Sequence, residues 1–263
     1  MHPFNHVAVP DGSIGIHWFG QNSFALKDAS GFTVLTDPYF PNDRPAEKFI
    51  YRTAPLDEAT METDLVLLTH DHGDHTCVES LQRIRAAHPA ARFVGPVESV
   101  ARMADAGFEG TCLTMIAAGD AIEVGGVSLH AVWSKPPEGV PTEGIGAPRV
   151  QHLGYVIEIG GARVYVTGDL INTFADHPEL MAPVAALKPE IGLITMHPTE
   201  GEFPFFDGVV KLAADLGLKA VVPAHYACFV RRTYDPVAFA KLLPEGGPQP
   251  LIIGYDRSVI YPA

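Results

Sequence analysis

The sequence is poor in cysteine and in cationic residues, and each shortage argues against a class of protein. Its three cysteines, Cys77, Cys112 and Cys228, are scattered and form no Cys-x-x-Cys pair. We therefore expect reduced thiols in a cytoplasmic protein instead of a disulfide scaffold. Lysine and arginine number 18 against 31 aspartates and glutamates, a formal net charge of −13. Nucleic-acid affinity rests on cations that neutralise phosphates, so this balance argues against a nucleic-acid partner.

Long apolar runs and linker-like tracts are also missing. No apolar stretch approaches the roughly 18–20 residues that span a bilayer, and residues 1–6 lack the basic and apolar regions of a signal peptide. We predict no membrane partner. No Ser/Gly-rich or charged tract divides the 263 residues, of which 47% are hydrophobic. The expected organisation is one domain, residues 1–263, with a large core, and the oligomeric state stays open.

Short strand patterns separated by Gly and Pro turns alternate with a few helix patterns, which indicates an α/β class. The predicted strands cover residues 14–19, 23–26, 33–36, 65–69, 93–95, 127–133, 155–159, 164–167, 192–195, 220–223, 251–254 and 258–261. The predicted helices cover residues 77–87, 97–106, 209–216 and 237–243. Asp207 and Gly217 would cap the third helix, and Pro236 would open the fourth.

What the chain does contain is a dense group of metal-binding side chains. Residues 69–76 read Thr-His-Asp-His-Gly-Asp-His-Thr, directly after the apolar run 65–68. Imidazole and carboxylate are preferred ligands of divalent metals. On an extended segment His70 and His72 point to one side and can share an ion. Gly73 would permit a turn that brings Asp74 and His75 to a second position, so the segment predicts a dinuclear site.

The run His70-x-His72-x-Asp74-His75 after an apolar strand resembles the signature of the metallo-β-lactamase superfamily. That signature continues with an Asp and a His after later strands, where this chain has Asp169 after 163–168 and His225 after 220–224. Segments 16–20 and 34–38 resemble landmarks of the branch that contains L-ascorbate 6-phosphate lactonase. The resemblance spans about residues 14–243. It implies a four-layer αββα sandwich with the site at one edge.

The resemblance also implies two divalent metal ions, for which zinc, manganese and iron are all compatible with His/Asp ligands. The implied ligands are, for the first ion, His70, His72 and a third residue and, for the second, Asp74, His75 and His225, with Asp169 shared by both. On the residues alone, Asp169 is also readable as a turn residue and His225 as a core histidine.

The third ligand of the first ion departs from the family pattern. The family usually carries a His just after the strand at 127–132, where this chain reads Trp-Ser-Lys-Pro. His152, just before the next strand, is the preferred candidate, and His130 within the first strand is the alternative. A site with no protein ligand at this place is the third reading.

The implied activity is metal-dependent hydrolysis of a lactone, amide or phosphoester bond in a small cytosolic substrate. Two ions that share a water lower its pKa from near 15.7 towards about 7. In family terms Asp74 would orient this water or carry its proton to the leaving group. Two alternatives stay open, a mononuclear iron dioxygenase of the same fold and a non-catalytic metal-bound scaffold.

Residues outside the ligand set have predicted roles as well. A ligating imidazole usually donates its other N–H to a carboxylate or carbonyl, and Asp37 is the candidate partner, with a turn opener as its alternative reading. Asp71 points away from the ions and would brace the loop. The candidate substrate-binding residues are Lys135, Arg149, His197 and Tyr226. The first two belong to the Pro/Gly-rich loop 134–149, which we expect to cover the metal edge.

Overall fold

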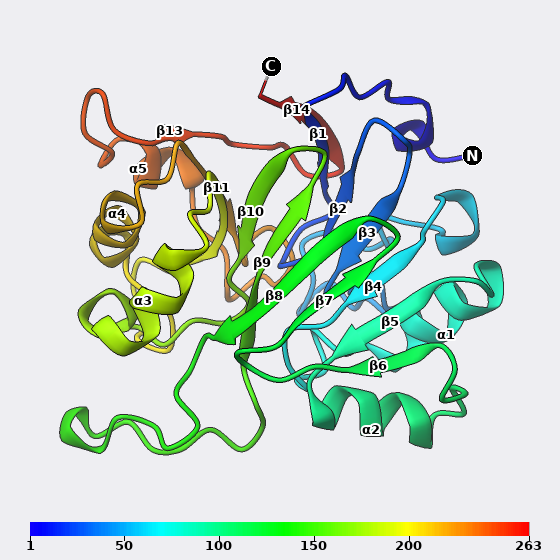
Figure 1. The fold of residues 1–263 in the computed structure, drawn as a ribbon, viewed down its shortest axis with the longest axis horizontal. Helices are drawn as coiled ribbons and strands as arrows, with labels where there is room; N and C mark the ends of the chain where they lie inside the picture. The colour runs from blue at the N-terminus through cyan, green and yellow to red at the C-terminus, as the bar shows by residue number, and fades with distance from the viewer. Residues whose placement is uncertain (263) are drawn as a thin grey trace.

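The structure is a computed structural model, and it describes residues 1–262. Two seven-stranded sheets form its centre, and helices lie on either side of them (Figure 1). In the first sheet the strand order is β14 (Arg257–Tyr261), β1 (Ile14–Trp18), β2 (Phe24–Lys27), β3 (Thr33–Thr36), β4 (Leu65–Leu67), β5 (Arg92–Gly95) and β6 (Leu113–Met115). In the second sheet it is β13 (Gln249–Pro250), β12 (Ala220–Ala224), β11 (Ile191–Thr195), β10 (Ala162–Val166), β9 (Leu153–Ile159), β8 (Val127–Trp133) and β7 (Ala121–Val124).

Each sheet is antiparallel in one half and parallel in the other. Strands β14 to β3 are antiparallel neighbours and β3 to β6 are parallel. In the second sheet β7 to β10 are antiparallel and β10 to β13 are parallel. The parallel half of each sheet is the half that needs crossover connections, and its helices therefore come from these segments.

The helices cover the outer faces of the two sheets (Figure 1). The first sheet carries α1 (Val78–Ala87) and α2 (Val97–Asp105), and the second carries α3 (Pro178–Ala186), α4 (Phe206–Asp215) and α5 (Pro236–Ala240). Short 3₁₀ helices are η1 (Pro3–His6), η2 (Glu58–Thr60), η3 (Pro141–Glu143) and η4 (Phe174–Asp176). The α/β fold of four layers, an αββα sandwich, is confirmed. Among residues 1–262, none of the helices combines the length and apolarity that crossing a bilayer requires.

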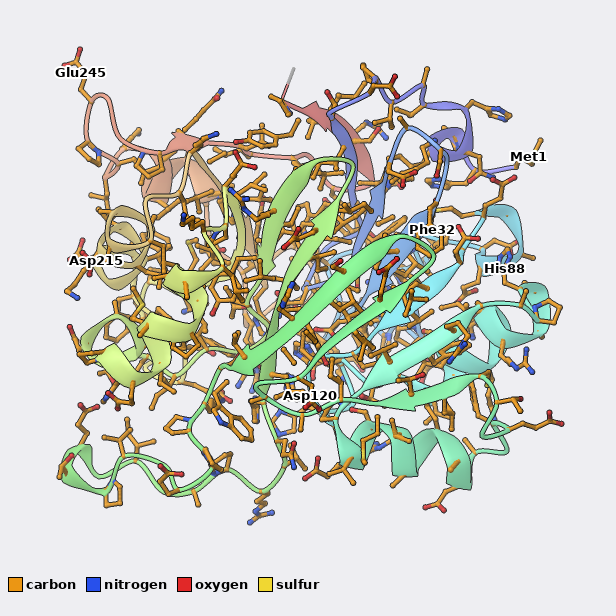
Figure 2. The ribbon with its side chains drawn as sticks, in the orientation of Figure 1. Met1, Phe32, His88, Asp120, Asp215 and Glu245 are labelled. Carbon is orange, nitrogen blue, oxygen red and sulfur yellow. The ribbon has the colours of Figure 1, made fainter. Side chains whose placement is uncertain are left out.

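Three apolar clusters hold the layers together. Both sheets contribute to the central cluster, where Trp18, Leu67 and Tyr155 are at most 1% exposed. Outer clusters pack α1 and α2 on the first sheet and α3 to α5 on the second, with Leu81 and Leu212 fully buried. Burial of one such side chain stabilises the fold by about 1.5–3 kcal/mol. Figure 2 shows side chains filling the space between the ribbons, with Asp215 and Glu245 on the outer margin.

The predicted strands and helices are largely confirmed, and two details were wrong. Helix α4 begins at Phe206, not after an Asp207 cap; its N-cap is Phe205 without a side-chain hydrogen bond. Residues 251–254 are not a strand, because this apolar segment crosses from β13 in one sheet to β14 in the other. The helix α3 and the strands β6 and β7 were missed. Pro183 inside α3 obscured its helical pattern.

Candidate metal centre

The predicted ligands lie at one edge of the sandwich, at the ends of strands from both sheets. His70 to His75 follow β4, Asp169 follows β10 and His225 follows β12. Parallel strands β10 and β12 end at the same edge, and β9 starts there because it is antiparallel to β10. The sheets are joined at this edge by a hydrogen bond from Leu153 N to Thr69 O at 2.9 Å.

The segment after β4 is clamped from behind by Asp37. This fully buried carboxylate accepts from Thr69 N at 2.8 Å and Thr69 Oγ1 at 2.6 Å, and lies 2.7 Å from His75 Nδ1. His75 Nδ1 therefore carries the proton that Asp37 accepts, and Nε2 is the ring nitrogen that faces Asp74 and Asp169. Asp71 instead faces outward to Arg102, with Oδ1 2.5 Å from Nε.

Two glycines near the ligands behave differently. Gly168 has φ +55°, and a Cβ there would lie 2.7 Å from Thr69 Cβ, so only glycine lets the two strand ends approach. The turn expected at Gly73 is present, but it does not require glycine, because Gly73 is not at positive φ and a Cβ would meet nothing within 4 Å. The turn is instead closed by hydrogen bonds from His75 N and Thr76 N to His72 O.

The first half of the candidate centre consists of His70, His72 and His152, whose ligand atoms lie within 4.8 Å of one another. His70 Nε2 is 3.0 Å from His72 Nδ1, and the rings of His70 and His152 are stacked at 4.1 Å. The alternative His130 lies elsewhere, next to Glu158 Oε1 at 3.5 Å. The end of β8 and the start of β9 pair, with Ser134 N bonded to His152 O, so His152 stands beside the position where the family pattern has its histidine.

The second half consists of Asp74, His75 and His225, which also lie within 4.8 Å of one another. Nε2 of His75 and Nε2 of His225 are each 3.9 Å from Asp74 Oδ2. Both imidazoles are fully buried, whereas the side chain of Asp74 is 23% exposed. Asp74 is therefore the member of this half that solvent and a ligand can reach.

Asp169 lies between the two halves and presents one oxygen to each. Its Oδ2 is 3.6 Å from His70 Nε2, and its Oδ1 is 3.5 Å from His75 Nε2 and 3.6 Å from His225 Nε2. The structure thus brings together all seven residues predicted as ligands. Their assignment as ligands stays a prediction.

The charges around the centre favour a cation. Burial lowers the pKa of His75, but Asp169, Asp37 and Asp74 outweigh it and raise the pKa well above its ordinary value. Burial raises the pKa of Asp169, but His75 and His225 hold it well below the usual range. Burial and Lys135 lower the pKa of His152 to about 2. Asp169 therefore stays charged at neutral pH while His152 stays neutral.

The donor set fits divalent ions. Metal bonds of about 2.0–2.2 Å to His and Asp place neighbouring ligand atoms roughly 3–4 Å apart. The measured separations of 3.0 to 3.9 Å lie in this range. Within the described chain, the buried Nε2 of His75 has no hydrogen-bond partner. A buried polar atom left alone is costly, and a bound cation would satisfy it.

Two residues of the site were missed by the sequence reasoning. Gln21 Nε2 lies 2.8 Å from both Asp74 Oδ2 and His225 Nε2, and Asn22 Nδ2 donates to Asp169 Oδ1 at 3.2 Å. They come from the turn between β1 and β2, where Gln21 has φ 54°. The signal was their position: they are polar residues just beyond a predicted strand, like the ligands.

The four predicted substrate-binding residues are scattered. Lys135 lies 3.8 Å from Glu202 Oε1 and close enough to His152 to affect its pKa. Arg149 is exposed and lines none of the pockets found near the centre. His197 Nδ1 accepts from the backbone N–H groups of residues 199 and 200. Tyr226 packs in the central core, 4.4 Å between its ring and that of Trp18.

The loop 134–149 was expected to cover the metal edge, and most of it goes elsewhere. Its middle forms η3 and reaches η4, where Glu143 accepts from Thr173 Oγ1 at 2.6 Å and lies 3.4 Å from His177. Only its first residues, near Lys135, lie beside the ligands. The long loop is therefore attached to the helical layer over the second sheet.

Comparisons with known proteins agree with this geometry. A family model described as "Beta-lactamase superfamily domain" matches residues 15–225. The chain is 29% identical over 216 residues to a UPF0173 metal-dependent hydrolase of Methanospirillum hungatei, covering 81% of this chain and 83% of that one. A UPF0173 metal-dependent hydrolase of Methanopyrus kandleri is 29% identical over 236 residues, covering 88% and 92%.

The fold is also found in a solved structure. Igni18, a metallo hydrolase from Ignicoccus hospitalis, superimposes with a TM-score of 0.70 at 20% identity, covering 95% of this chain and 99% of that one. At this identity the likeness concerns the fold alone.

Proposed function

The chain belongs to the beta-lactamase superfamily, and from this premise we propose that it is a metal-dependent hydrolase with a dinuclear centre. The observation that carries the proposal is the position of Asp169. Its two carboxylate oxygens face different sets of imidazoles, at 3.5 to 3.6 Å. A carboxylate placed in this way could be shared by two cations, one at each oxygen.

Each of the seven predicted ligands has a proposed place around one or both ions. His70, His72 and His152 would hold one ion, Asp74, His75 and His225 the other, and Asp169 both. Bound ions of this kind lower the pKa of a shared water so that hydroxide is present at neutral pH, and they polarise the oxygen of the bond to be cleaved. Asp37 fixes the tautomer of His75 by accepting from Nδ1.

Asp74 is the proposed catalytic residue. It is the exposed carboxylate of the centre, and a carboxylate beside a bound water can orient it and take its proton. Asp74 can then pass that proton to the leaving group of the substrate, because its side chain is partly exposed and a bound substrate can contact it. Gln21 Nε2 donates to Asp74 Oδ2 at 2.8 Å.

The substrate class that we propose is a small molecule with a lactone, amide or phosphoester bond, and the metals are Zn²⁺ or Mn²⁺. The lactonase-like branch is supported by the segments 16–20 and 34–38 noted above. In the structure these segments form the ends of β1 and β3; the first directly precedes Gln21, and the second contains Asp37. They are thus part of the site's support.

Metal analysis combined with a substrate panel tests the proposal. The purified protein should hold about two equivalents of metal by mass spectrometry, and it should hydrolyse members of a panel of lactones, amides and phosphodiesters with zinc or manganese. Asp169→Ala should lose metal from both halves and lose turnover while its circular dichroism spectrum is unchanged. Asp71→Ala is the matched control, because its carboxylate in the same loop faces Arg102.

Two results would count against the proposal. Full metal content and turnover in Asp169→Ala would show that this residue bridges nothing. Oxygen uptake by an iron-loaded sample, with no hydrolysis of any panel member, would favour the dioxygenase alternative instead.

A further inference from the structure

A pocket of about 740 Å³ opens beside Asp74. Its lining is Tyr39, Glu47, Lys48, Gly73, Asp74, Phe229, Arg231 and Arg232. Pockets for small ligands usually measure about 300–1,000 Å³, so this one has room for a substrate of that size. The pocket that contains Lys135 measures only about 190 Å³ and includes none of the proposed ligands.

Three cations line this pocket in a protein with a net charge of −13. Arg232 is already paired with Glu200 at 3.1 Å and Glu202 at 3.2 Å. Lys48 and Arg231 are both exposed. Within residues 1–262, neither has a carboxylate oxygen within 4.0 Å of its charged nitrogen atoms. Two positive groups at the pocket mouth are therefore available to a ligand.

Aromatic contacts and backbone hydrogen bonds join the apolar wall of the pocket, and Lys48 lies against this wall. The rings of Phe49 and Phe229 lie 5.4 Å apart, and that of Tyr39 lies 5.7 Å from Phe229. Hydrogen bonds at 2.9 Å join Ile50 N to Cys228 O and Val230 N to Lys48 O, so two distant segments are paired here. Lys48 Nζ lies 5.3 Å from the centroid of Phe49 and 5.6 Å from that of Phe229. Contacts of this type hold an ammonium group over aromatic rings.

We propose that this pocket binds an anionic substrate, whose carboxylate or phosphate group contacts Lys48 and Arg231 and whose apolar body lies against Tyr39 and Phe229. The scissile bond then lies at Asp74. This inference rests on the proposed function, because it names the substrate class of the same centre. The recognition residues in this inference are Lys48 and Arg231, which the sequence did not single out, in place of Arg149 and Tyr226.

Gly73 supports this arrangement. It lines the pocket next to Asp74, and a Cβ at this position would meet nothing within 4 Å. The absence of a side chain at this lining position leaves space in the pocket beside Asp74.

Equilibrium binding to the metal-loaded protein tests the inference without requiring turnover. The probes are 4-ethylbenzoate, phenylphosphonate and the neutral 4-ethylbenzamide, titrated by NMR. The double variant Lys48→Ala/Arg231→Ala should weaken binding of the better anion about tenfold, the size expected for two exposed charge contacts. Binding of the amide should change less than about twofold. The anion that binds more tightly to the native protein identifies carboxylate or phosphate as the recognised group.

The control is Arg85→Ala/Lys241→Ala, which removes the same charge away from the pocket. Anion binding should be retained in this variant, whereas an equal loss would assign the effect to net charge and overturn the inference. An unchanged affinity for both anions in the Lys48/Arg231 variant would also overturn it, since the anions would then contact the metals alone. If the protein binds the anions as expected yet hydrolyses nothing, the proposed function fails and the pocket assignment stands.

Discussion

The two halves of the candidate centre are built differently. The first half has three imidazoles and no carboxylate of its own, and His72 is exposed to solvent. The second half has one carboxylate and two fully buried imidazoles, with Asp37 behind His75. Charge therefore favours a cation in the second half, while the first relies on the nitrogen atoms of neutral imidazoles.

The comparison indicates that the features that favour binding of a metal ion and the features that give solvent access differ between the two halves. The second half is supported by the charged Asp37, whose Oδ2 lies 2.7 Å from His75 Nδ1. In the first half the partner of His70 Nδ1 is the neutral hydroxyl of Thr69 at 3.1 Å, and the buried Nδ1 of His152 has no hydrogen-bond partner among the described residues. We expect the second half to keep its ion longer during chelation.

The largest expected effects come from two single variants, each of which removes one imidazole from one half. His152→Ala and His225→Ala should each release one equivalent of metal, because each removes a ligand from one half only. Turnover should fall by more than about 100-fold in both variants, beyond the loss usual for a group that merely supports a ligand. Metal content by mass spectrometry and kcat on the active panel substrate measure the two effects. Release of both equivalents from either variant would show that the halves do not bind independently.

The sequence could predict those ligands of the two halves that lie close together along the chain. His70 to His75 lie within six positions, so their clustering required no knowledge of the fold. His152 could only be ranked, because its place depends on the pairing of β8 with β9. The sandwich layers came from the resemblance, since periodicity does not specify how sheets stack.

Other features depend on contacts that no local pattern contains. Lys48 and Phe229 form one pocket wall although 180 residues separate them, a distance in sequence at which no spacing rule applies. Gln21 reaches the site through a left-handed backbone conformation, φ 54°, which is uncommon for a residue other than glycine. The position of Tyr226 is a further example: it follows the strand-end residue His225, and its ring packs in the central core.

A smaller effect is expected where Asp37 supports the second half. Asp37→Asn retains the shape but removes the charge that accepts from His75 Nδ1 and Thr69. Metal affinity of the second half should fall about 10–100-fold, the range for loss of a partner behind a ligand. A competition titration with a fluorescent chelator measures both affinities. The first half should change little, and an equal fall in both halves would mean that Asp37 acts on the whole loop through Thr69.

The smallest expected effect concerns Gln21, and its sign is informative. In the metal-free protein the amide donates to lone pairs of Asp74 and His225, the same lone pairs that an ion in the second half would use. Each such bond stabilises the metal-free state by a net 0.5–1.5 kcal/mol or so, on the order of typical hydrogen bonds. Gln21→Ala should therefore tighten metal binding in the second half by roughly fivefold, measured by the same chelator titration.

The variant Gln21→Glu distinguishes two roles of the Gln21 amide: competition with the metal ion for Asp74 and His225, and support of these two ligands. It retains the length of the side chain, replaces the donor by a carboxylate and adds a negative charge beside the ion, so it should tighten binding more than Gln21→Ala. All three side chains share the left-handed backbone of residue 21, so strain does not distinguish them. Weaker metal binding in Gln21→Ala would reverse the argument, because the amide would then hold Asp74 and His225 in place for the ion. The second half would in that case owe its affinity to this side chain as well as to its charge.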